Sequence, residues 1–546
     1  MSGLPRLTPA FRPAQVEKLP PCQAGCPISG SVRTWIGMVA QRGKMGLSPD
    51  EAYARAWGVI AERNPFPSTL GRVCPHPCED GCNRSALDQP VSINAMERFL
   101  GDWAIAQQLP LARLEEEEQP ESIGVIGAGP SGLSFAYQLA RRGYRVTIYE
   151  RQEQAGGMLR YGIPDYRLPS GVLDAEIDRI VRLGIELHVG TTVGRDVSLA
   201  ELRERHDVLY VAIGAQAGRG LGIAGDDDPA VWNGVDYLAA VNRGVPVPVG
   251  ESVIVVGGGN TAVDAARTAR RAGAEVTILY RRSREEMPAI DAEVEEALAE
   301  GVGLLLLVAP ARIERRDRAS LVLTAVRMQL GEPDESGRRR PLAIPESEFE
   351  LSADTVIAAV SQEPAWAGLE ELRCDGWLAA DERGALTGSV WGGGDAVQLG
   401  IAGDAIAHGL RAAVTLDARL RGRCEPPADP RRQIGSDALR LDSFAPRTRA
   451  PRAHLSPGEA VSRPRAEVSL GISEDDLLAE ASRCFSCGSC FGCEQCWMFC
   501  TARNYTRLAD ARPGAYFSLS LDACKDCGKC IEVCPCGFLE VVDGLT

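Results

Sequence analysis

Six cysteines crowd into one short stretch near the end of the chain, which reads CFSCGSCFGCEQCWMFC from Cys484 to Cys500. Cysteines at such close spacing can form disulfides, hold zinc, or bind the iron–sulfur clusters that carry electrons. The chain has 18 cysteines, and all but Cys374 and Cys424 lie in one group near each end. We take those two isolated residues as structural thiols and look for chemistry in the groups.

Two runs in the C-terminal group share the spacing C-x2-C-x2-C-x3-C. The runs are Cys490, Cys493, Cys496, Cys500 and Cys524, Cys527, Cys530, Cys534. Bacterial two-cluster ferredoxins use this spacing, and the fourth cysteine of each run binds the cluster of the other run. Zinc ribbons instead use two separated C-x2-C pairs. The repeat therefore predicts two interlocked [4Fe–4S] clusters.

In this interlocked arrangement each cluster takes three cysteines from one run and one from the other. The first set is Cys490, Cys493, Cys496 and Cys534, and the second is Cys524, Cys527, Cys530 and Cys500. Three cysteines are left over, either as redox-silent thiols or as alternative ligands: Cys484, Cys487 and Cys536.

The N-terminal group has an irregular spacing and consists of Cys22, Cys26, Cys74, Cys78 and Cys82. Five thiols suffice for one four-iron cluster, with a zinc or purely structural site as the alternative. Apolar residues recur at three- and four-residue spacing in the flanking segments 31–44, 49–63 and 92–108, which predicts helices. We expect a helical domain clamped by one cluster. His76, inside the cysteine loop, could tune or ligate that cluster, although its position favours a surface role.

Composition restricts the class of protein. The net charge of −15 argues against a nucleic-acid partner, because phosphate backbones attract basic faces. The longest apolar run, residues 302–309, is too short for a membrane span and predicts a buried strand. The first residues lack the apolar core of a secretory signal, so we expect a cytoplasmic protein with reduced cysteines.

The segment after residue 120 has the pattern of a dinucleotide-binding fold. An apolar strand leads into Gly127, Gly129 and Gly132 of a G-x-G-x-x-G motif, followed by a helix and a strand that ends at Glu150. The glycines permit a tight turn and close approach to a pyrophosphate at the helix N-terminus. Glu150 stands where an acidic residue binds the ribose hydroxyls. This spacing predicts an FAD site.

A second unit of the same kind begins at residue 252, with Gly257 and Gly259 in its turn. Arg281 and Arg282 lie close to the position that Glu150 has in the first unit. Two guanidinium groups suit a 2′-phosphate, which predicts NADP(H) with NAD(H) as the alternative. The other interpretation of these arginines is solvated surface charge.

A later segment, SVWGGGDAV, ends a strand at Gly394 and Asp395, and a helix starts soon after it. An Asp in that place can bind the flavin ribityl chain. We therefore predict an α/β protein whose FAD domain is interrupted by the NADP(H) domain. The expected parts are a helical iron–sulfur domain (1–118), an FAD domain (119–225 and 352–424), an NAD(P)H domain (226–351), an extended linker (425–475) and an α+β ferredoxin-like domain (476–546).

From about residue 15 to its end the chain resembles the glutamate synthase small-subunit family of FAD and iron–sulfur oxidoreductases. The resemblance rests on PPCQAGCP, GRVCPHPCEDGC, VIGAGPSGL, GGMLRYGIPDYRLP, GGGNTAVD, YRRSREEMPA and GGGDAV. Together with the motifs above, it implies cofactor binding by Gly127, Gly129, Pro130, Ser131, Gly132, Glu150, Arg151, Gly157, Met158, Leu159, Arg160, Gly257, Gly259, Asn260, Thr261, Arg281, Arg282, Gln362, Gly394 and Asp395.

The resemblance also implies a function. In that family NAD(P)H reduces FAD by hydride transfer, and iron–sulfur clusters pass electrons to a partner. We expect no catalytic acid or base, since the cofactors carry the chemistry. The expected partner is a ferredoxin or a 2-oxoacid:ferredoxin oxidoreductase type of protein in a hetero-oligomer. The alternatives are a true glutamate synthase small subunit and a non-catalytic iron–sulfur scaffold.

Overall fold

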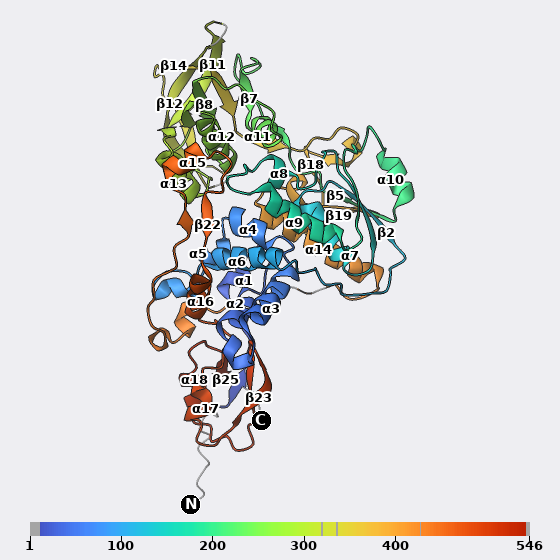
Figure 1. Cartoon of the computed structure of the whole chain (residues 1–546), viewed down its shortest axis with the longest axis vertical. Coiled ribbons are helices and arrows are strands. Elements are labelled where there is room, and N and C mark those ends of the chain that lie inside the picture. The colour runs from blue at the N-terminus through green and yellow to red at the C-terminus, as the bar shows by residue number, and fades with distance from the viewer. Residues whose placement is uncertain (1–10, 318–319, 335–336, 426, 428, 542–546) are drawn as a thin grey trace, which may run out of the picture. The chain divides into compact units, whose positions relative to one another are not determined.

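The computed structural model describes residues 11–541 except 318–319, 335–336, 426 and 428, and they form two compact units. The nucleotide unit comprises Arg113–Cys424 and Ala453–Leu470. The helical–ferredoxin unit comprises the described residues up to Ala112, Glu425–Arg452 and those from Gly471 on. In Figure 1 the cyan, green and yellow parts of the chain belong to the nucleotide unit.

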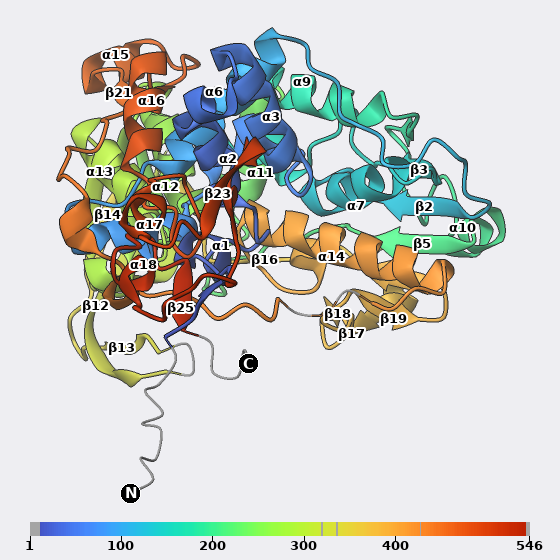
Figure 2. The ribbon, with the colours of Figure 1, turned by 90° about the horizontal axis from the view of Figure 1, so that it is seen from below.

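The first sheet of the nucleotide unit has the strand order β19-β20-β5-β2-β3-β4. Its strands are β2 (Ser122–Ile126), β3 (Arg145–Tyr149), β4 (Glu186–His188), β5 (Val208–Val211), β19 (Ala385–Thr387) and β20 (Val390–Gly392). Two helices, α7 (Pro130–Ala140) and α14 (Ala402–Leu420), pack side by side against it (Figure 2). Strand β20 comes after the second sheet in the sequence but pairs with β5, which confirms a discontinuous fold.

The second sheet is wholly parallel, with the strand order β10-β9-β8-β15-β7. Its strands are β7 (Val231–Asn233), β8 (Ser252–Val256), β9 (Glu275–Tyr280), β10 (Gly303–Leu306) and β15 (Thr355–Ala358). Strand β15 lies past residue 351, where we expected this domain to end, because its four buried residues fill the place between β8 and β7. Strand β10 is at the sheet edge, so Leu305 is exposed and the expected buried strand is only half covered.

An antiparallel sheet lies between β10 and β15 in the sequence. It consists of β11 (Val308–Arg315), β12 (Leu321–Pro333), β13 (Arg339–Ala343) and β14 (Phe349–Ala353). Residues of β12, such as Leu321 and Leu323, share a buried core with Ile254 and Val356 of the second sheet. This addition therefore packs against the parallel sheet rather than forming a separate fold.

The expected N-terminal helices are present as α2 (Val32–Ala40), α3 (Pro49–Ala61) and α6 (Ile93–Ala106). Helix α3 begins with a capping box between Ser48 and Glu51 and with Pro49 at its first position. The apolar faces meet in a core that includes Trp35, Met96 and, from α16 (Glu474–Arg483), Leu477. Figure 1 shows α16 in dark red beside the blue N-terminal helices. A late segment thus completes the N-terminal helical fold.

The C-terminal part of the same unit is an α+β fold. A hairpin of β23 (Tyr505–Arg512) and β24 (Ala515–Leu519) accompanies two short helices, α17 (Gln495–Phe499) and α18 (Lys529–Glu532). The last described strand, β25 (Leu539–Val541), pairs antiparallel with β1 (Pro13–Gln15). The two ends of the described chain therefore lie together in one sheet.

The segment predicted as an extended linker, 425–475, is only partly extended. It contains α15 (Pro457–Ser462), which starts because Ser456 and Glu459 form a capping box and Pro457 suits the first helical position. The residues up to Arg452 pack in the helical–ferredoxin unit, and Ala453–Leu470 pack in the nucleotide unit.

In the part of the chain that the structure describes, no helix combines the length and the apolar character needed to cross a membrane.

Candidate functional sites

The turn between β2 and α7 has the geometry of a phosphate-binding loop. Gly127 has φ +103°, and a Cβ there would collide with the carbonyl oxygen of Ala212. A Cβ on Gly132 would collide with the carbonyl oxygen of Gly127. Gly129 precedes α7, Pro130 occupies its first turn, and the Ser131 hydroxyl hydrogen-bonds the Tyr210 hydroxyl at 2.8 Å. The free N–H groups of this helix start are suited to a pyrophosphate.

Glu150 connects this turn to the end of β3. One carboxylate oxygen accepts a hydrogen bond from the Ala128 N–H at 2.7 Å, and the other accepts one from the Gln152 N–H at 2.8 Å. Burial raises the pKa of Glu150, although both backbone hydrogen bonds favour its charged form. Glu150 thus braces the glycine loop at the edge where the sequence places the ribose. Its neighbour Arg151 donates to Gln216 at 2.6 Å.

A second loop lies against the glycine turn. Gly157 has φ +54°, and a Cβ there would come within 2.8 Å of Gly129 Cα. The predicted residues Met158, Leu159 and Arg160 form the short helix α8 (Met158–Tyr161) that follows. Leu159 is buried, and Arg160 donates to the carbonyl of Ala155 and pairs with Asp174. The structure therefore places the predicted residues 157–160 beside the glycine turn that precedes α7.

Gly394 and Asp395 lie between β20 and α14. Gly394 has φ +70°, and its N–H donates to His408 Nδ1 at 3.0 Å. A Cβ on Gly394 would come within 2.9 Å of Ser131 Cβ, so this segment touches the start of α7. Burial raises the pKa of Asp395 to about 6. The predicted FAD residues of three distant segments thus meet around the first turn of α7.

The equivalent turn in the second sheet joins β8 to α12 (Asn260–Arg271). Gly257 has φ +149°, and a Cβ there would collide with the carbonyl oxygen of Ala359. Gly259 caps α12, and Asn260 accepts a hydrogen bond from the Ile290 N–H at 2.9 Å. Gln362 donates to the Thr261 hydroxyl at 3.2 Å and so ties the chain after β15 to this helix start.

The two predicted 2′-phosphate arginines differ in the structure. Arg282 is buried. Its guanidinium donates hydrogen bonds to Asp334 at 2.6 Å and to the Arg339 carbonyl at 2.8 Å. Arg281 is exposed beside it. Both line an open hollow that also contains Arg338 and Arg340. Arg282 is therefore held by the protein, and Arg281 is the more accessible guanidinium.

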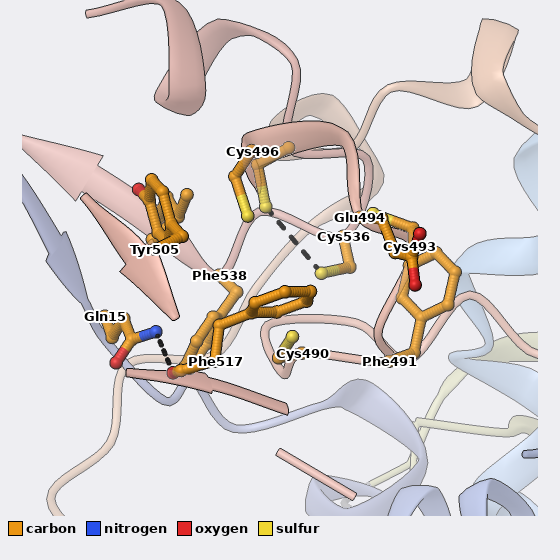
Figure 3. Close-up of a pocket in the computed structure, with 12 residues that line it drawn as sticks. Gln15, Cys490, Phe491, Cys493, Glu494, Cys496, Tyr505, Phe517, Cys536 and Phe538 are labelled. Carbon is orange, nitrogen blue, oxygen red and sulfur yellow. Dashed lines mark hydrogen bonds between the residues drawn. The ribbon is translucent and has the colours of Figure 1, made fainter. Parts of the chain in front are cut away.

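The first predicted set of C-terminal cysteines lines a small enclosed cavity (Figure 3). Cys490, Cys493, Cys496 and Cys534 surround it together with Cys536, and Phe491, Phe517 and Phe538 add apolar walls. The Cys536 and Cys534 thiols are 3.8 Å apart. A hydrogen bond from Cys536 lowers the pKa of Cys534, whereas burial raises the pKa of Cys490 to about 11. Thiols buried this way need a counter-charge to ionise, which iron supplies.

The second predicted set lines a neighbouring cavity between α17 and α18. Cys500, Cys524, Cys527 and Cys530 lie on it, together with Phe11, Phe499 and Tyr505. Cys500 follows the first run and the other three belong to the second. The chain is thus folded so that each run contributes its fourth cysteine to the other run's cavity, as the spacing predicted.

The N-terminal cysteines fall into two groups. Burial raises the pKa of Cys22 and of Cys78; Cys82 is among the thiols that raise the first further, and Cys26 and Cys74 raise the second. Binding of one cluster by this set of five stays a prediction. Cys484 and Cys487 also neighbour Cys22, although they were not among the predicted ligands. Their own C-x2-C spacing could have marked them as a ligand pair. His76 is half-buried with its ring 3.6 Å from Glu79, and burial lowers its pKa.

No disulfide joins any of the 18 cysteines, all of which lie in the described part of the chain, and Cys374 and Cys424 are exposed and lie apart from the two groups. Among the described residues, no three His, Cys, Asp or Glu side chains converge as ligands of a single metal ion would. A zinc site needs four ligands around one ion, whereas a cubane distributes its thiolates over separate iron atoms and needs a wider spacing. Thiols that line a cavity therefore suit a [4Fe–4S] cluster better than a single zinc ion.

Comparison with protein families identifies both kinds of module. The family described as pyridine nucleotide-disulphide oxidoreductase matches residues 121–409. The family described as dihydropyrimidine dehydrogenase domain II, 4Fe-4S cluster, matches residues 9–109. The first match covers the two sheets of the nucleotide unit that carry the glycine turns, and the second covers the N-terminal cysteines. FAD, NADP(H) and [4Fe–4S] clusters are the cofactors of this chain.

Three relatives carry informative names. The chain is 39% identical to the NADP(+)-dependent formate dehydrogenase subunit beta of Moorella thermoacetica, over 73% of this chain and 60% of that protein. It is 38% identical to the NADPH-Fe(3+) oxidoreductase subunit beta of Geobacter sulfurreducens, over 66% of this chain and 54% of that protein. It is 34% identical to the glutamate synthase [NADPH] small chain of Azospirillum brasilense, over 75% of this chain and 88% of that protein.

The chain spans less than two thirds of the length of the first two relatives. The third confirms the resemblance to glutamate synthase small subunits. The chain therefore belongs to the pyridine nucleotide-disulphide oxidoreductase family, with a 4Fe–4S domain of the dihydropyrimidine dehydrogenase type at its N-terminal end.

Proposed function

We propose that this chain is an electron-transfer subunit that passes electrons between NADP(H) and a redox partner protein. The observation that carries the proposal is the pair of thiol-lined cavities formed by the interlocked cysteine runs, in a chain that also contains two dinucleotide folds. FAD accepts electron pairs from the nicotinamide and the clusters accept single electrons. The partner we favour is a ferredoxin or a 2-oxoacid:ferredoxin oxidoreductase, in a hetero-oligomer in the cytoplasm.

The side chains and backbone of the chain serve this function by binding the cofactors and positioning them for electron transfer. Glu150 and the glycines around the start of α7 would hold FAD, and Asp395 would lie beside it. The glycines at the start of α12, with Asn260, would hold NADP(H). The two C-terminal sets of four cysteines would each hold a [4Fe–4S] cluster. No side chain is needed as an acid or base, since hydride transfer depends on alignment of the two cofactors.

The proposal is tested by steady-state turnover under anaerobic conditions. The purified protein should oxidise NADPH and reduce an added two-cluster ferredoxin, with the two rates matching at two ferredoxin electrons per NADPH. If NADPH neither bleaches the bound flavin nor reduces the added ferredoxin, the electron-transfer role is contradicted and the scaffold alternative is favoured. Copurification of a glutamate synthase large subunit would instead favour the second candidate, which the 88% coverage of the A. brasilense small chain supports.

Arg281 should set the preference for NADPH over NADH. An exposed guanidinium at this place can bind the 2′-phosphate, and a charged hydrogen bond of this kind contributes about 1.5–3 kcal/mol. Arg281→Ala should therefore raise the KM for NADPH roughly 10- to 100-fold and leave that for NADH unchanged.

The control for this variant is Arg312→Ala. Arg312 is an exposed arginine of the same unit that pairs with Glu314 at 3.2 Å, and its loss should change neither KM. Equal effects of Arg281→Ala on NADPH and NADH would show that Arg281 does not contact the 2′-phosphate.

The partner should bind at α17. Trp497, Met498 and Phe499 are 42%, 60% and 50% exposed, and this short apolar helix lies between the two thiol-lined cavities. Exposed apolar groups beside an electron exit suit a redox protein that brings its own cluster close. Replacing Trp497 and Met498 by serine should slow ferredoxin reduction roughly tenfold and leave reduction of the flavin by NADPH unchanged.

Leu470→Ser provides the matched control, because Leu470 is 52% exposed in the nucleotide unit. It should have no effect on either rate. If the α17 variant reduces ferredoxin at the original rate, the partner binds elsewhere.

A further inference from the structure

The segment that carries Cys484 and Cys487 is fixed to the N-terminal helical domain. It follows α16, whose residues Leu477 and Ala481 are buried in the same core as Trp35 and Met96. Arg483, at the end of α16, is fully buried and donates to Glu480 at 2.8 Å, to Asp88 at 2.9 Å and to the Gln89 carbonyl at 2.6 Å. The place of the two cysteines is therefore set by an extensive buried network.

Two arginines from the N-terminal domain hold the backbone around these cysteines. Arg33 donates to the carbonyl of Cys487 and, at 2.8 Å, to that of Lys18. Arg84, two residues after Cys82, donates to the carbonyl of Arg483 at 3.0 Å. The Arg84 guanidinium also lies over the ring of Phe485, 4.8 Å from its centroid. The loop of Cys484 and Cys487 is thus anchored beside Cys22 on one side and Cys82 on the other.

Four thiols are near neighbours here. Burial raises the pKa of Cys22, and the nearby Cys484, Cys487 and Cys82 raise it further. Asn83, the residue after Cys82, hydrogen-bonds the Cys487 thiol. Cys22, Cys82 and Cys484 all pack against the core of the helical domain. The set is built from three segments that are far apart in the sequence.

The other N-terminal thiols form a separate group. Cys78 has Cys26 and Cys74 as neighbours, and the carboxylate of Glu97 acts on both Cys26 and Cys78. Cys22 lies within the short helix α1 (Pro21–Ala24), and Cys26 follows its C-cap Gly25. These neighbours suit a second N-terminal cluster beside the first.

The surroundings of the four-thiol set suit a buried, negatively charged group. Arg33 and Arg84 contribute positive charge next to Cys484, and both side chains are almost fully buried. Buried guanidinium groups near thiolates offset the charge that four ionised cysteines bring to one site.

We propose that Cys22, Cys82, Cys484 and Cys487 hold a [4Fe–4S] cluster of their own, so that a C-terminal cysteine pair completes a site of the N-terminal domain. This site rests on the iron–sulfur content of the proposed function, and adds a cluster to the one expected near the N-terminus. It also gives a role to two of the three cysteines that the ferredoxin spacing leaves over. The remaining one, Cys536, lies in the first C-terminal cavity.

The test is the iron and acid-labile sulfide content of full-length protein purified without oxygen. Cys22→Ser and Cys484→Ser should each remove about four irons per chain, and the double variant should lose no more than either single one. Combining Cys484→Ser with Cys78→Ser should remove about twice as much. Electron paramagnetic resonance of the dithionite-reduced protein should lose the same signal in both single variants. Cys374→Ser, at an exposed isolated thiol, should leave iron and signals unchanged.

Several results would overturn the proposal. Unchanged iron in Cys484→Ser, additive losses in the Cys22 and Cys484 pair, or zinc in place of iron would each do so. Flavin content serves as the folding check, because the FAD residues belong to the other compact unit. If Cys484→Ser does not fold, Cys487→Ser tests the same site. Flavin reduction by NADPH should persist in every variant, so failure of this site and failure of the proposed function are distinguishable.

Discussion

Gly127→Ala is expected to weaken FAD binding and to lower the rate of NADPH oxidation with it. The backbone at Gly127 has φ +103°, which L side chains rarely adopt, and the new methyl group would collide with the Ala212 carbonyl. Relieving a strain of about 1–3 kcal/mol requires the loop to move away from its phosphate-binding form. FAD affinity should fall roughly 10- to 100-fold, measured as flavin per chain after gel filtration.

Gly257→Ala is the matched variant in the second dinucleotide fold. Its φ of +149° and a collision with the Ala359 carbonyl produce the same kind of strain at the start of α12. This protein should retain its flavin and bind NADPH roughly 10- to 100-fold more weakly. If Gly257→Ala lost flavin and Gly127→Ala lost only NADPH, the two sites would have to be exchanged.

Cys534→Ser is expected to remove one C-terminal cluster and stop electron delivery. Cys534 belongs to the second run but lines the cavity of the first, and the hydrogen bond from Cys536 favours its thiolate. The variant should lose about four irons per chain. Ferredoxin reduction should fall roughly 10- to 100-fold or more, the range seen when metal sites lose a supporting group. Reduction of the flavin by NADPH should continue at the original rate.

Cys536→Ser is the most demanding control, because this thiol lines the same cavity only 3.8 Å from Cys534. We expect it to retain its iron, with a shifted cluster potential from the lost hydrogen bond. Loss of the cluster in Cys536→Ser but not in Cys534→Ser would assign the fourth ligand to Cys536.

The sequence was sufficient for the parts of the protein that depend on local spacing. The glycine turns, the interrupted FAD fold and the interlocked ferredoxin runs all appear where their motifs predict them. Each of these features is announced by a short motif of a few residues, even where the strands or cysteines that it brings together are far apart in the sequence. They can therefore be predicted without knowledge of the tertiary fold.

The features that the sequence did not predict depend on distant residues. Arg282 looks like a phosphate ligand by its place after β9, but Asp334 from the antiparallel addition holds it. Strand β15 follows a run of antiparallel strands, and only its pairing with β8 and β7 places it in the parallel sheet. Cys484 and Cys487 lie next to a ferredoxin run in sequence, yet fold against Cys22. No local pattern distinguishes these cases.

One titration shows whether electrons from NADPH pass through the flavin to the iron–sulfur clusters. NADPH is added stepwise to the anaerobic protein, with flavin absorbance followed optically and the clusters by electron paramagnetic resonance. We expect flavin bleaching together with reduced-cluster signals, and loss of part of those signals in Cys534→Ser. Bleaching with no cluster signal, in protein whose clusters dithionite does reduce, would contradict electron flow from NADPH to the clusters.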